Sequence, residues 1–598
     1  MNSMNEVQPT LHGWPRIAGP AIILVAAFVA TSPQLFRGNS CGHDFNFHLV
    51  SWLDTVASWR HGSFYPHWAP SPNFGAGEPR FVFYPPLTWM LGALIGLVAP
   101  WKGVPLVVTC LLLAGTGLAT RMLARQALAE GPATLAGCMA MFSGYALFTA
   151  YERSAFGELS GGFWIPLLLL LVFRDRNATS GVWRRAFDGS TAPLALVLCG
   201  AWLSNAPLGV MASYLLAAVA LAMAVQLRSW APVLRATVAA VLGLGLAAFY
   251  LVPAAMEQKW VEIRQATDDP GLLIENSWMF ARHASNPALE LHDVELFKAS
   301  AIGITMIAVA LGGLLIAWRR GKLTGKREWW IGLALIPVVV FLLQLPISLP
   351  VWNVLPKLRF LQFPWRWMVV LEAPMAIFFS SAVWMSRRWL HASLVGVCAV
   401  WFLGATLFAT QVFFQFCDNE DSVRGTLRAY RNGSGFEGTD EYAPPGADDS
   451  LVALNLPDAC LTANPRVVLA TSVDELTPVY QPETGLCDAT FSWNDNAGTA
   501  SAEHLHLAAV TPRAGYLVLK LRTYPAWQIK LNGQLIRSLP QREDGLMVVP
   551  VPHGPVSLAV DWSTTEDVIA GRWLSLVALA LVTCICLLER GRAKARLS

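Results

Sequence analysis

Residues 104–123 read VPLVVTCLLLAGTGLATRML, a run of twenty residues with one charge, Arg121. A helix rises 1.5 Å per residue, so about 20 apolar residues cross the roughly 30 Å hydrocarbon core of a bilayer. Further apolar runs of this kind lie at 17–36, 132–150, 160–173, 190–205, 207–227, 234–252, 300–318, 329–349, 367–385, 391–411 and 568–588. The sequence therefore predicts a polytopic α-helical membrane protein with about twelve spans.

The composition of the 598 residues supports this prediction. Hydrophobic residues make up 54% of the chain and charged residues 14%, and the mean hydropathy is +0.45. A soluble domain carries about 25% charge, so a large soluble enzyme and a disordered chain are both excluded. The net charge of +3 is too small to indicate nucleic acid as a partner, and the 25 Trp are typical of interfacial belts.

The distribution of Lys and Arg predicts which face each loop occupies, because cytoplasmic loops are enriched in these residues. The basic clusters fall at every second loop if the N-terminus is cytoplasmic and the run 83–99 does not cross. We therefore predict that 83–99, which opens with Tyr84-Pro85-Pro86, is re-entrant or interfacial; thirteen spans are the alternative. The clusters are Arg121/Arg125, Arg174/Arg176/Arg184/Arg185, Arg228/Arg235, Arg319/Arg320/Lys322/Lys326/Arg327, Arg387/Arg388 and Arg590/Arg592/Lys594/Arg596.

This topology places both termini in the cytoplasm, with an uncleaved first span rather than a signal peptide. It predicts a transmembrane domain at 1–411 with outer loops 37–103 and 253–299. An extracytoplasmic domain follows at 412–567, and 568–598 form a last span and a basic tail.

Residues 412–567 have the pattern of an antiparallel β-sandwich. The alternating runs Tyr516-Leu-Val-Leu-Lys-Leu, Trp527-Gln-Ile-Lys-Leu and Val556-Ser-Leu-Ala-Val are typical of half-buried strands. The turn signals Asn532-Gly533 and Asp544-Gly545 separate some of them.

Four of the ten Cys lie on the predicted outer face, and the other six lie inside predicted spans. An even number in an oxidising compartment permits disulfides. Of the three pairings we favour Cys460–Cys487 and Cys41–Cys417; four unpaired thiols are the alternative. No Cys or His spacing indicates zinc.

The first outer loop contains the most informative polar residues. It reads Cys41-Gly-His-Asp-Phe-Asn-Phe-His48, and apolar residues then recur at helical spacing from Leu49 to Trp59. This pattern predicts an amphipathic helix on the membrane surface. Asp44 stands at its start, where the helix dipole favours a carboxylate, and Asp44 and His48 share one face. The alternative is that Asp44 only caps the helix.

Two further charged clusters lie on the same predicted face. Tyr151-Glu-Arg-Ser-Ala-Phe-Gly-Glu158 follows the third span, and Glu158 opens an apolar run, where an ionisable group indicates a functional site. The segment Lys357-Leu-Arg-Phe-Leu-Gln-Phe-Pro-Trp-Arg366 carries cations suited to phosphate. The alternatives are a structural Glu–Arg pair in the first cluster and lipid headgroup contact in the second.

Together these clusters favour a reaction at the outer surface, because an ion-coupled transporter more often carries charge near the bilayer midplane. The chain contains no P-loop, no dinucleotide-binding glycine motif and no Gly-x-Ser-x-Gly elbow.

The order and spacing of these motifs resemble the GT-C superfamily, membrane glycosyltransferases that use polyprenyl-phosphate or polyprenyl-diphosphate sugars. More narrowly, the chain resembles a family of bacterial membrane proteins labelled pyruvoyl-tetrahydropterin synthase-related, and its C-terminal part resembles YfhO-like membrane proteins. The matching stretches are 42–48, 62–68, 83–87, 151–158, 363–366, 524–533 and 544–545.

The resemblance implies that Asp44 is the catalytic carboxylate and that Glu152 or Glu158 is the second acidic residue. We predict Asp44 and Glu158 as catalytic. The residues predicted to bind substrate are His43, His48, Glu152, Arg153, Arg359, Gln362 and Arg366. A lone Asp44 stands beside His43 where several relatives carry two adjacent acids, so the resemblance leaves a metal, Mg²⁺ or Mn²⁺, undecided.

The implied function is transfer of a sugar from a polyprenyl-phosphate-linked donor to an envelope glycan, lipid or protein acceptor, with inversion. The site would lie at the outer face of the cytoplasmic membrane. The alternatives are a transporter or flippase of lipid-linked sugars and a non-catalytic scaffold for envelope assembly.

Overall fold

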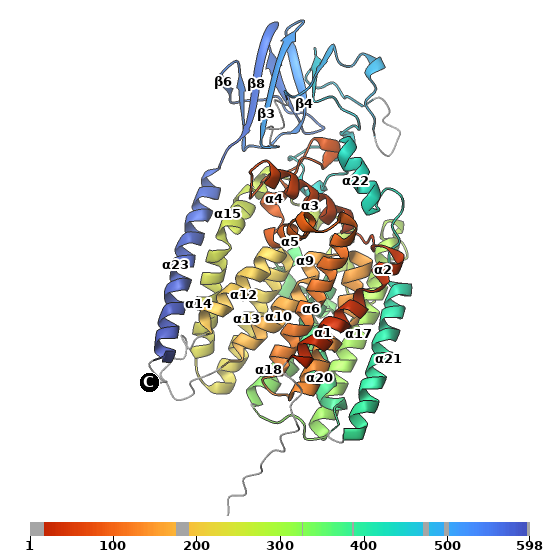
Figure 1. Ribbon diagram of the computed structural model, residues 1–598. Helices are drawn as coiled ribbons and strands as arrows, with labels where there is room; N and C mark the ends of the chain where they lie inside the picture. The colour runs from red at the N-terminus through yellow and green to blue at the C-terminus, as the bar shows by residue number, and fades with distance from the viewer. Residues whose placement is uncertain are drawn as a thin grey trace, which may run out of the picture.

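The computed structural model describes residues 17–174, 190–325, 327–385, 388–470, 478–494 and 502–594. A bundle of apolar helices forms one part of the molecule, and a β-domain covers one end of it (Figure 1). We call this end of the bundle the β-domain end.

Within the described residues, eight helical segments are long and apolar enough to cross a membrane, and ten if each bent pair is counted as one span. The eight contain α1 (Ala18–Thr31) with α2 (Pro33–Arg37), α6 (Val104–Ala124), α7 (Glu130–Met141) with α8 (Gly144–Phe148), α13 (Ala206–Leu227), α17 (Glu290–Arg319), α20 (Met368–Val383), α21 (Arg388–Val412) and α23 (Glu566–Lys594). The bent pairs are α14 (Ala231–Leu246) with α15 (Ala248–Met256), at 73°, and α18 (Arg327–Leu343) with α19 (Leu349–Val354), at 97°.

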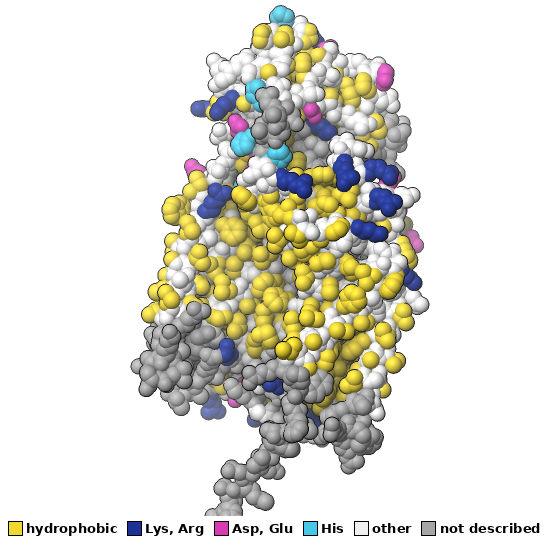
Figure 2. Space-filling model, viewed as in Figure 1, with side chains coloured by type: hydrophobic (Ala, Val, Ile, Leu, Met, Phe, Trp, Pro, Cys, Tyr) yellow, Lys and Arg dark blue, Asp and Glu magenta, His cyan; other side chains and the backbone are white. Residues whose placement is uncertain are grey.

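The other two predicted spans are shorter helices, α10 (Gly161–Val172) and α12 (Thr191–Ser204). They lie inside the bundle, where α10 packs on α6 and α20, and α12 packs on α14. All twelve predicted runs are thus helical, and the predicted fold class, a polytopic helical protein with a C-terminal β-domain, is confirmed. Figure 2 shows a broad hydrophobic band on the visible face of the bundle, with Lys and Arg gathered above it.

The run 83–99 forms α4 (Arg80–Phe83) and the 13-residue α5 (Pro86–Val98). At 1.5 Å per residue α5 is about 20 Å long, too short to cross a hydrocarbon core of about 30 Å. It lies beside α3 near the β-domain end (Figure 1). This length fits the re-entrant or interfacial helix that the charge pattern predicts.

The predicted amphipathic helix is α3 (Phe45–Arg60), but it does not lie exposed on a membrane surface. Its polar face is buried too, because the loop that follows covers it. Asp54 accepts hydrogen bonds from the hydroxyl of Ser71 at 2.5 Å and from its amide at 3.3 Å. Arg80 donates to Ser51 at 3.1 Å and pairs with the buried Glu78 at 2.6 Å. The predicted location on the membrane surface was therefore wrong. Residues 62–80, which have no periodic pattern, supply polar partners to α3, and the helical pattern of α3 itself does not reveal them.

The β-domain contains two four-stranded sheets in which all pairings are antiparallel. Their orders are β2-β1-β4-β7 and β3-β8-β5-β6. One apolar core joins them, with Leu517 and Leu519 from the first sheet and Leu507 and Leu558 from the second. The strands are β1 (Ala459–Thr462), β2 (Ala489–Phe491), β3 (His504–Thr511), β4 (Gly515–Arg522), β5 (Trp527–Leu531), β6 (Gln534–Ile536), β7 (Leu546–Val551) and β8 (Gly554–Trp562).

The two predicted turns differ in their role. Asn532 and Gly533 both have positive φ, 50° and 82°, and close the β5–β6 hairpin as a two-residue turn requires. Asp544-Gly545 instead precedes β7, which pairs with β4 in the other sheet.

Both favoured disulfides are present. Cys41–Cys417 ties the first loop to the segment that follows α21, across 376 residues, and Cys460–Cys487 lies within the β-domain. The other six Cys are unpaired.

The β-domain rests on the first loop. Glu503 accepts a hydrogen bond from the amide of His67 at 2.6 Å, and the ring of His67 stacks on Trp562. Trp68 packs against Trp527 and Trp562. These contacts hold the β-domain against the first loop and therefore over this end of the bundle.

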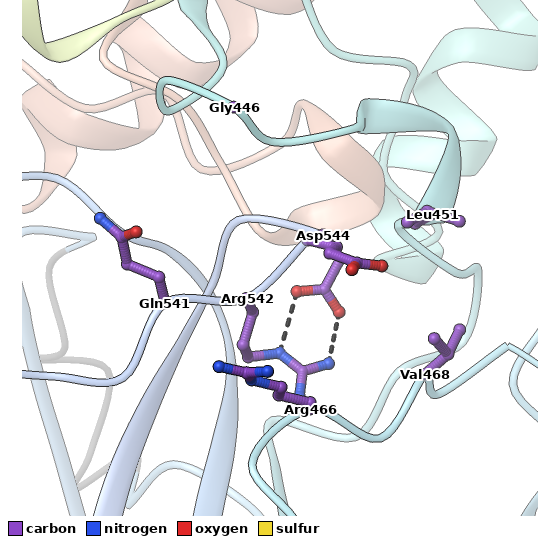
Figure 3. Close-up of a pocket in the computed structure, with 8 residues that line it drawn as sticks. Gly446, Leu451, Arg466, Val468, Gln541, Arg542 and Asp544 are labelled. Atoms are coloured by element: carbon purple, nitrogen blue, oxygen red, sulfur yellow. Dashed lines mark hydrogen bonds and ion pairs between the residues drawn. The ribbon is translucent and has the colours of Figure 1, made fainter.

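The β-domain also contains a small polar pocket of about 250 Å³ (Figure 3). Arg542 is held there by two hydrogen bonds to Asp544, of 2.9 and 2.5 Å, and by the carbonyls of Pro465 and Val467. Because its guanidinium is already engaged on all sides, we assign Arg542 a structural role.

Candidate functional site

A cavity of about 640 Å³ lies between the bundle and the first outer loop, under the segment that precedes the β-domain. Its lining contains both polar and apolar side chains. The polar lining residues include His43, Asp44, Asn205, Gln258, Lys357, Gln362, Thr439 and Glu441, together with Glu158 and Arg366. The apolar lining residues include Trp202, Pro207, Val210, Leu251, Ala254, Ile263 and Phe360.

Asp44 occupies the N-cap position of α3, but its carboxylate makes no capping hydrogen bond to the helix. Its side chain is 41% exposed and lines the cavity. Its amide donates to the carbonyl of Arg153 at 2.9 Å. A Cβ on Gly42 would meet the carbonyl oxygen of Glu152 at 2.5 Å, so glycine permits this close docking of the two segments. Asp44 is therefore free to serve the cavity rather than its helix.

Arg153 and Glu158 form the centre of a buried ionic network beside Asp44. Arg153 Nη1 hydrogen-bonds to Glu158, Arg153 Nη2 lies 4.0 Å from Asp44 Oδ2, and Arg153 Nε lies 3.7 Å from Glu295 Oε1. Glu158 also accepts a hydrogen bond from the buried Tyr145 hydroxyl. Arg153 is thus shared by three carboxylates and stacks over Trp365 at 4.9 Å.

The local backbone explains how Glu152 and Glu158 come to face different surroundings. Residues Thr149–Arg153 form a π-helical turn, and Ser154 is left-handed with φ 51°. Such turns recur at functional sites. Glu152 turns away from the cavity and pairs with Lys298 of α17 at 2.7 Å, whereas Glu158 lines the cavity.

Arg366 presents a cation to the cavity next to Glu158. Its Nε lies 3.4 Å from Glu158 Oε2, and Nη1 donates to the carbonyl of Leu361 at 3.0 Å. Gln362, the residue that follows Leu361, has φ 62° and ψ −50°. The amide of Phe363 donates to the carbonyl of Leu361 at 2.6 Å, so the chain turns at Gln362. This is a classic γ-turn, a strained conformation of the kind found at functional sites.

The remaining predicted residues divide between the cavity and its surroundings. His43 lines the cavity, and its Nδ1 lies 3.8 Å from Glu295 Oε2. His48 is buried among aromatic rings, including Trp52, Tyr84 and Phe156, and burial lowers its pKa to about 4. A neutral, enclosed imidazole of this kind supports packing.

Arg359 does not line the cavity; it pairs with Glu275 at 2.5 Å and with Asn353 near the surface. Its neighbour Lys357 does line the cavity, and Lys357 Nζ donates to Gln258 at 3.2 Å.

Several residues of the site were missed in the sequence. Glu295 and Lys298 lie three residues apart at the polar start of α17 and therefore share one face of that helix. This spacing is only a weak indication that the face contacts another segment of the chain. Tyr145 lies within an apolar run. Glu441 is separated from Asp44 by almost 400 residues and belongs to no recognisable motif.

In the part of the chain that the structure describes, no group of three or more His, Cys, Asp or Glu side chains could hold a metal ion. Asp44 and Glu158 are instead both paired with Arg153. In the described residues these two carboxylates thus share one arginine and have no third ligand that would complete a site for Mg²⁺ or Mn²⁺.

Comparison with known proteins gives one family and several distant structural likenesses. A family model described as "6-pyruvoyl-tetrahydropterin synthase related domain; membrane protein" matches residues 81–417, more than half of the chain. No curated protein matches.

Among solved structures, the chain is 13% identical to an oligosaccharyltransferase of Archaeoglobus fulgidus tethered to an acceptor peptide, with a TM-score of 0.41. The match covers 72% of this chain and 61% of that one, so the chain spans less than two thirds of that protein's length. It is 15% identical to the mycobacterial arabinofuranosyltransferase AftD (TM-score 0.38, 80% of this chain and 32% of that one). It is also 15% identical to ArnT of Cupriavidus metallidurans bound to undecaprenyl phosphate (TM-score 0.27, 64% and 78%). These likenesses are distant.

Proposed function

The chain belongs to the 6-pyruvoyl-tetrahydropterin synthase related family of membrane proteins, and we propose that it is a membrane glycosyltransferase. It would transfer a sugar from a polyprenyl-phosphate-linked donor to an envelope glycan, lipid or protein acceptor. The observation that carries the proposal is the cavity itself, whose lining combines a carboxylate that does not cap its helix, Asp44, and a cation, Arg366, with many apolar side chains.

The donor fits the polar and apolar lining residues of the cavity by its chemistry. Arg366 and Lys357 supply the positive charge that a phosphate requires. The apolar lining, which includes Trp202, Val210 and Leu251, suits the first isoprene units. The donor phosphate would thus lie against Arg366 with its lipid directed into the bundle.

Asp44 would act as general base on the acceptor hydroxyl. The acceptor oxygen attacks the anomeric carbon, the bond from that carbon to the phosphate oxygen breaks, and Asp44 takes the proton. Arg366, held by Glu158, stabilises the charge on the departing polyprenyl phosphate. A single displacement of this kind inverts the anomeric configuration.

The β-domain end would face the extracytoplasmic side of the cytoplasmic membrane, with both termini in the cytoplasm. Both disulfides lie at this end, and disulfides persist in oxidising compartments. Basic residues such as Arg121, Arg228 and Arg319 terminate helices at the opposite end of the bundle, as short cytoplasmic loops require. The β-domain would then cover the acceptor entrance.

The test is turnover by purified protein in nanodiscs with a panel of polyprenyl-phosphate sugars and candidate envelope acceptors, measured as released polyprenyl phosphate. Asp44→Asn removes the base and should abolish turnover. Asp268→Asn is the matched control, because Asp268 is an exposed carboxylate at the end of the short helix Gln265–Asp268 and does not line the cavity. Saturable lipid binding without turnover in wild type and Asp44→Asn alike would replace the transferase with a flippase or a scaffold.

A further inference from the structure

Glu441 lines the cavity from a part of the chain that lies outside the family match at 81–417. It belongs to the short 3₁₀ turn Asp440–Tyr442, in the segment that joins α21 to the β-domain. Its position within the cavity differs from that of Asp44. The charges that act on Glu441 are those of Glu78, Asp440 and Arg80, whereas Asp44 pairs with Arg153. The two carboxylates of the cavity therefore have different charged neighbours.

The backbone on both sides of Glu441 is fixed by buried contacts. Before it, the amide and the hydroxyl of Thr439 donate to the carboxylate of Glu78, at 2.8 and 3.0 Å. After it, the ring of Tyr442 stacks on Phe83, with centroids 5.5 Å apart and planes inclined by 20°. The amide of Glu262 then donates to the carbonyl of Ala443 at 2.9 Å. Glu441 is thus positioned rigidly at the cavity wall.

The carboxylate of Glu441, by contrast, has no side-chain partner within the described ranges. The nearby cation Arg80 does not pair with Glu441, because Arg80 forms its ion pair with Glu78. Burial, together with the nearby carboxylates Glu78 and Asp440, raises the pKa of Glu441 to about 7. The carboxyl group of Glu441 is hydrogen-bonded to its own backbone amide alone, so its remaining acceptor positions are available to a ligand in the cavity.

The charge around Glu441 indicates which ligand it fits. An anionic phosphate is repelled by Glu441, Glu78 and Asp440 and is attracted to Arg366 and Lys357 instead. A neutral sugar carries hydroxyls that hydrogen-bond a carboxyl group in either protonation state. Sugar rings also pack against aromatic side chains, which Phe83 and Tyr442 supply beside Glu441.

We propose that Glu441, with Phe83 and Tyr442, forms the acceptor subsite, in which the Glu441 carboxylate accepts hydrogen bonds from hydroxyls of a neutral sugar in a glycan acceptor. This inference rests on the proposed transferase function. It narrows the acceptor class to glycans and assigns the carboxylate that recognises them to the segment 418–458, outside the family match, with Phe83 contributed from inside that match.

The test measures binding of the full-length protein in nanodiscs to arrays of neutral hexose and pentose oligosaccharides and of their amino-sugar counterparts. Glu441→Gln keeps the shape and removes the charge-assisted hydrogen bonds, so glycan affinity should fall roughly 10- to 150-fold. Asp440→Asn is the matched control, because Asp440 is the adjacent carboxylate and is exposed outside the cavity. It should bind glycans within about twofold of wild type. Undecaprenyl phosphate binding reports the fold and should stay unchanged in both.

Unchanged glycan affinity in Glu441→Gln overturns the proposal, as does the absence of any glycan bound by wild type. If Glu441→Gln loses affinity only for amino-sugar glycans, the partner of Glu441 is an ammonium group rather than a hydroxyl, and the proposal is also overturned. If Glu441→Gln loses undecaprenyl phosphate binding, Glu441→Asp decides, because a carboxylate shortened by one methylene should still weaken glycan binding without disturbing the fold. The transferase is judged separately, by turnover in Asp44→Asn.

Discussion

Glu158→Gln should damage catalysis far more than Glu152→Gln, although the two acids stand six residues apart. Glu158 is buried, and its carboxylate pairs with Arg366 at 3.4 Å. The same carboxylate accepts hydrogen bonds from Arg153 and Tyr145. Removing its charge leaves the amide to hold Arg366. Hydrogen bonds to charged groups contribute about 1.5–3 kcal/mol, so loss of this alignment should lower kcat roughly 10- to 150-fold.

Glu152 provides the matched comparison. It pairs with Lys298, whose side chain is 27% exposed, and it does not line the cavity. Glu152 itself is buried, so loss of this pair should appear mainly in stability; because neither side chain lines the cavity, Glu152→Gln should change kcat by less than about threefold.

The assay is release of polyprenyl phosphate in nanodiscs under saturating donor, with thermal unfolding followed in parallel to exclude loss of fold. Arg153 retains Asp44 and Glu295 in the Glu158→Gln protein, which should keep the bundle folded. An equal fall in kcat for both variants, or wild-type turnover in Glu158→Gln, would refute the assignment of Glu158 to the site.

Three further predictions follow from the same structure. Cys41→Ser with Cys417→Ser should lower the stability of the first loop by about 2–5 kcal/mol, seen as faster proteolysis within residues 37–103, whereas Cys110→Ser should have no such effect. A chelator should leave turnover unchanged, because Arg153 already neutralises the carboxylates of the site; a loss restored by Mg²⁺ or Mn²⁺ would contradict this. Burial raises the pKa of Asp54 to about 6 from an ordinary value near 4, so the folded state binds this proton more tightly than the unfolded state. Stability should therefore fall as pH rises from about 4 to about 6, and thermal scans of Asp54→Asn should show a weaker pH dependence over that window.

The helices were predictable because their signal is local. A run of about 20 apolar residues cannot be solvated in water, wherever the rest of the chain lies. All twelve runs that the sequence marks are helical in the structure. The strands at Tyr516, Trp527 and Val556 were predictable for the same reason, since alternation along one strand reports one buried face.

The site was predictable only in part. The motifs around Asp44, Glu158 and Arg366 were found by their charge in apolar surroundings, and all three line one cavity. The same reasoning also selected Arg359 and His48, which lie outside it. An arginine near the surface and an arginine in a cavity have the same local sequence signal, because the partner that separates them, Glu275 or Glu158, comes from elsewhere in the chain.

The sequence alone determined the class of protein, the positions of its helices, the β-sandwich and the three charged clusters, because hydrophobic periodicity and charge act over a few neighbouring residues. Only the tertiary structure decided which acid serves the cavity. A π-helical turn and the left-handed Ser154 rotate Glu152 toward Lys298 and Glu158 toward Arg366. It alone also brought Glu441 to the cavity, across almost 400 residues from Asp44. Side chains from distant segments converge because those segments pack together, and no local pattern in the chain encodes which distant segments meet.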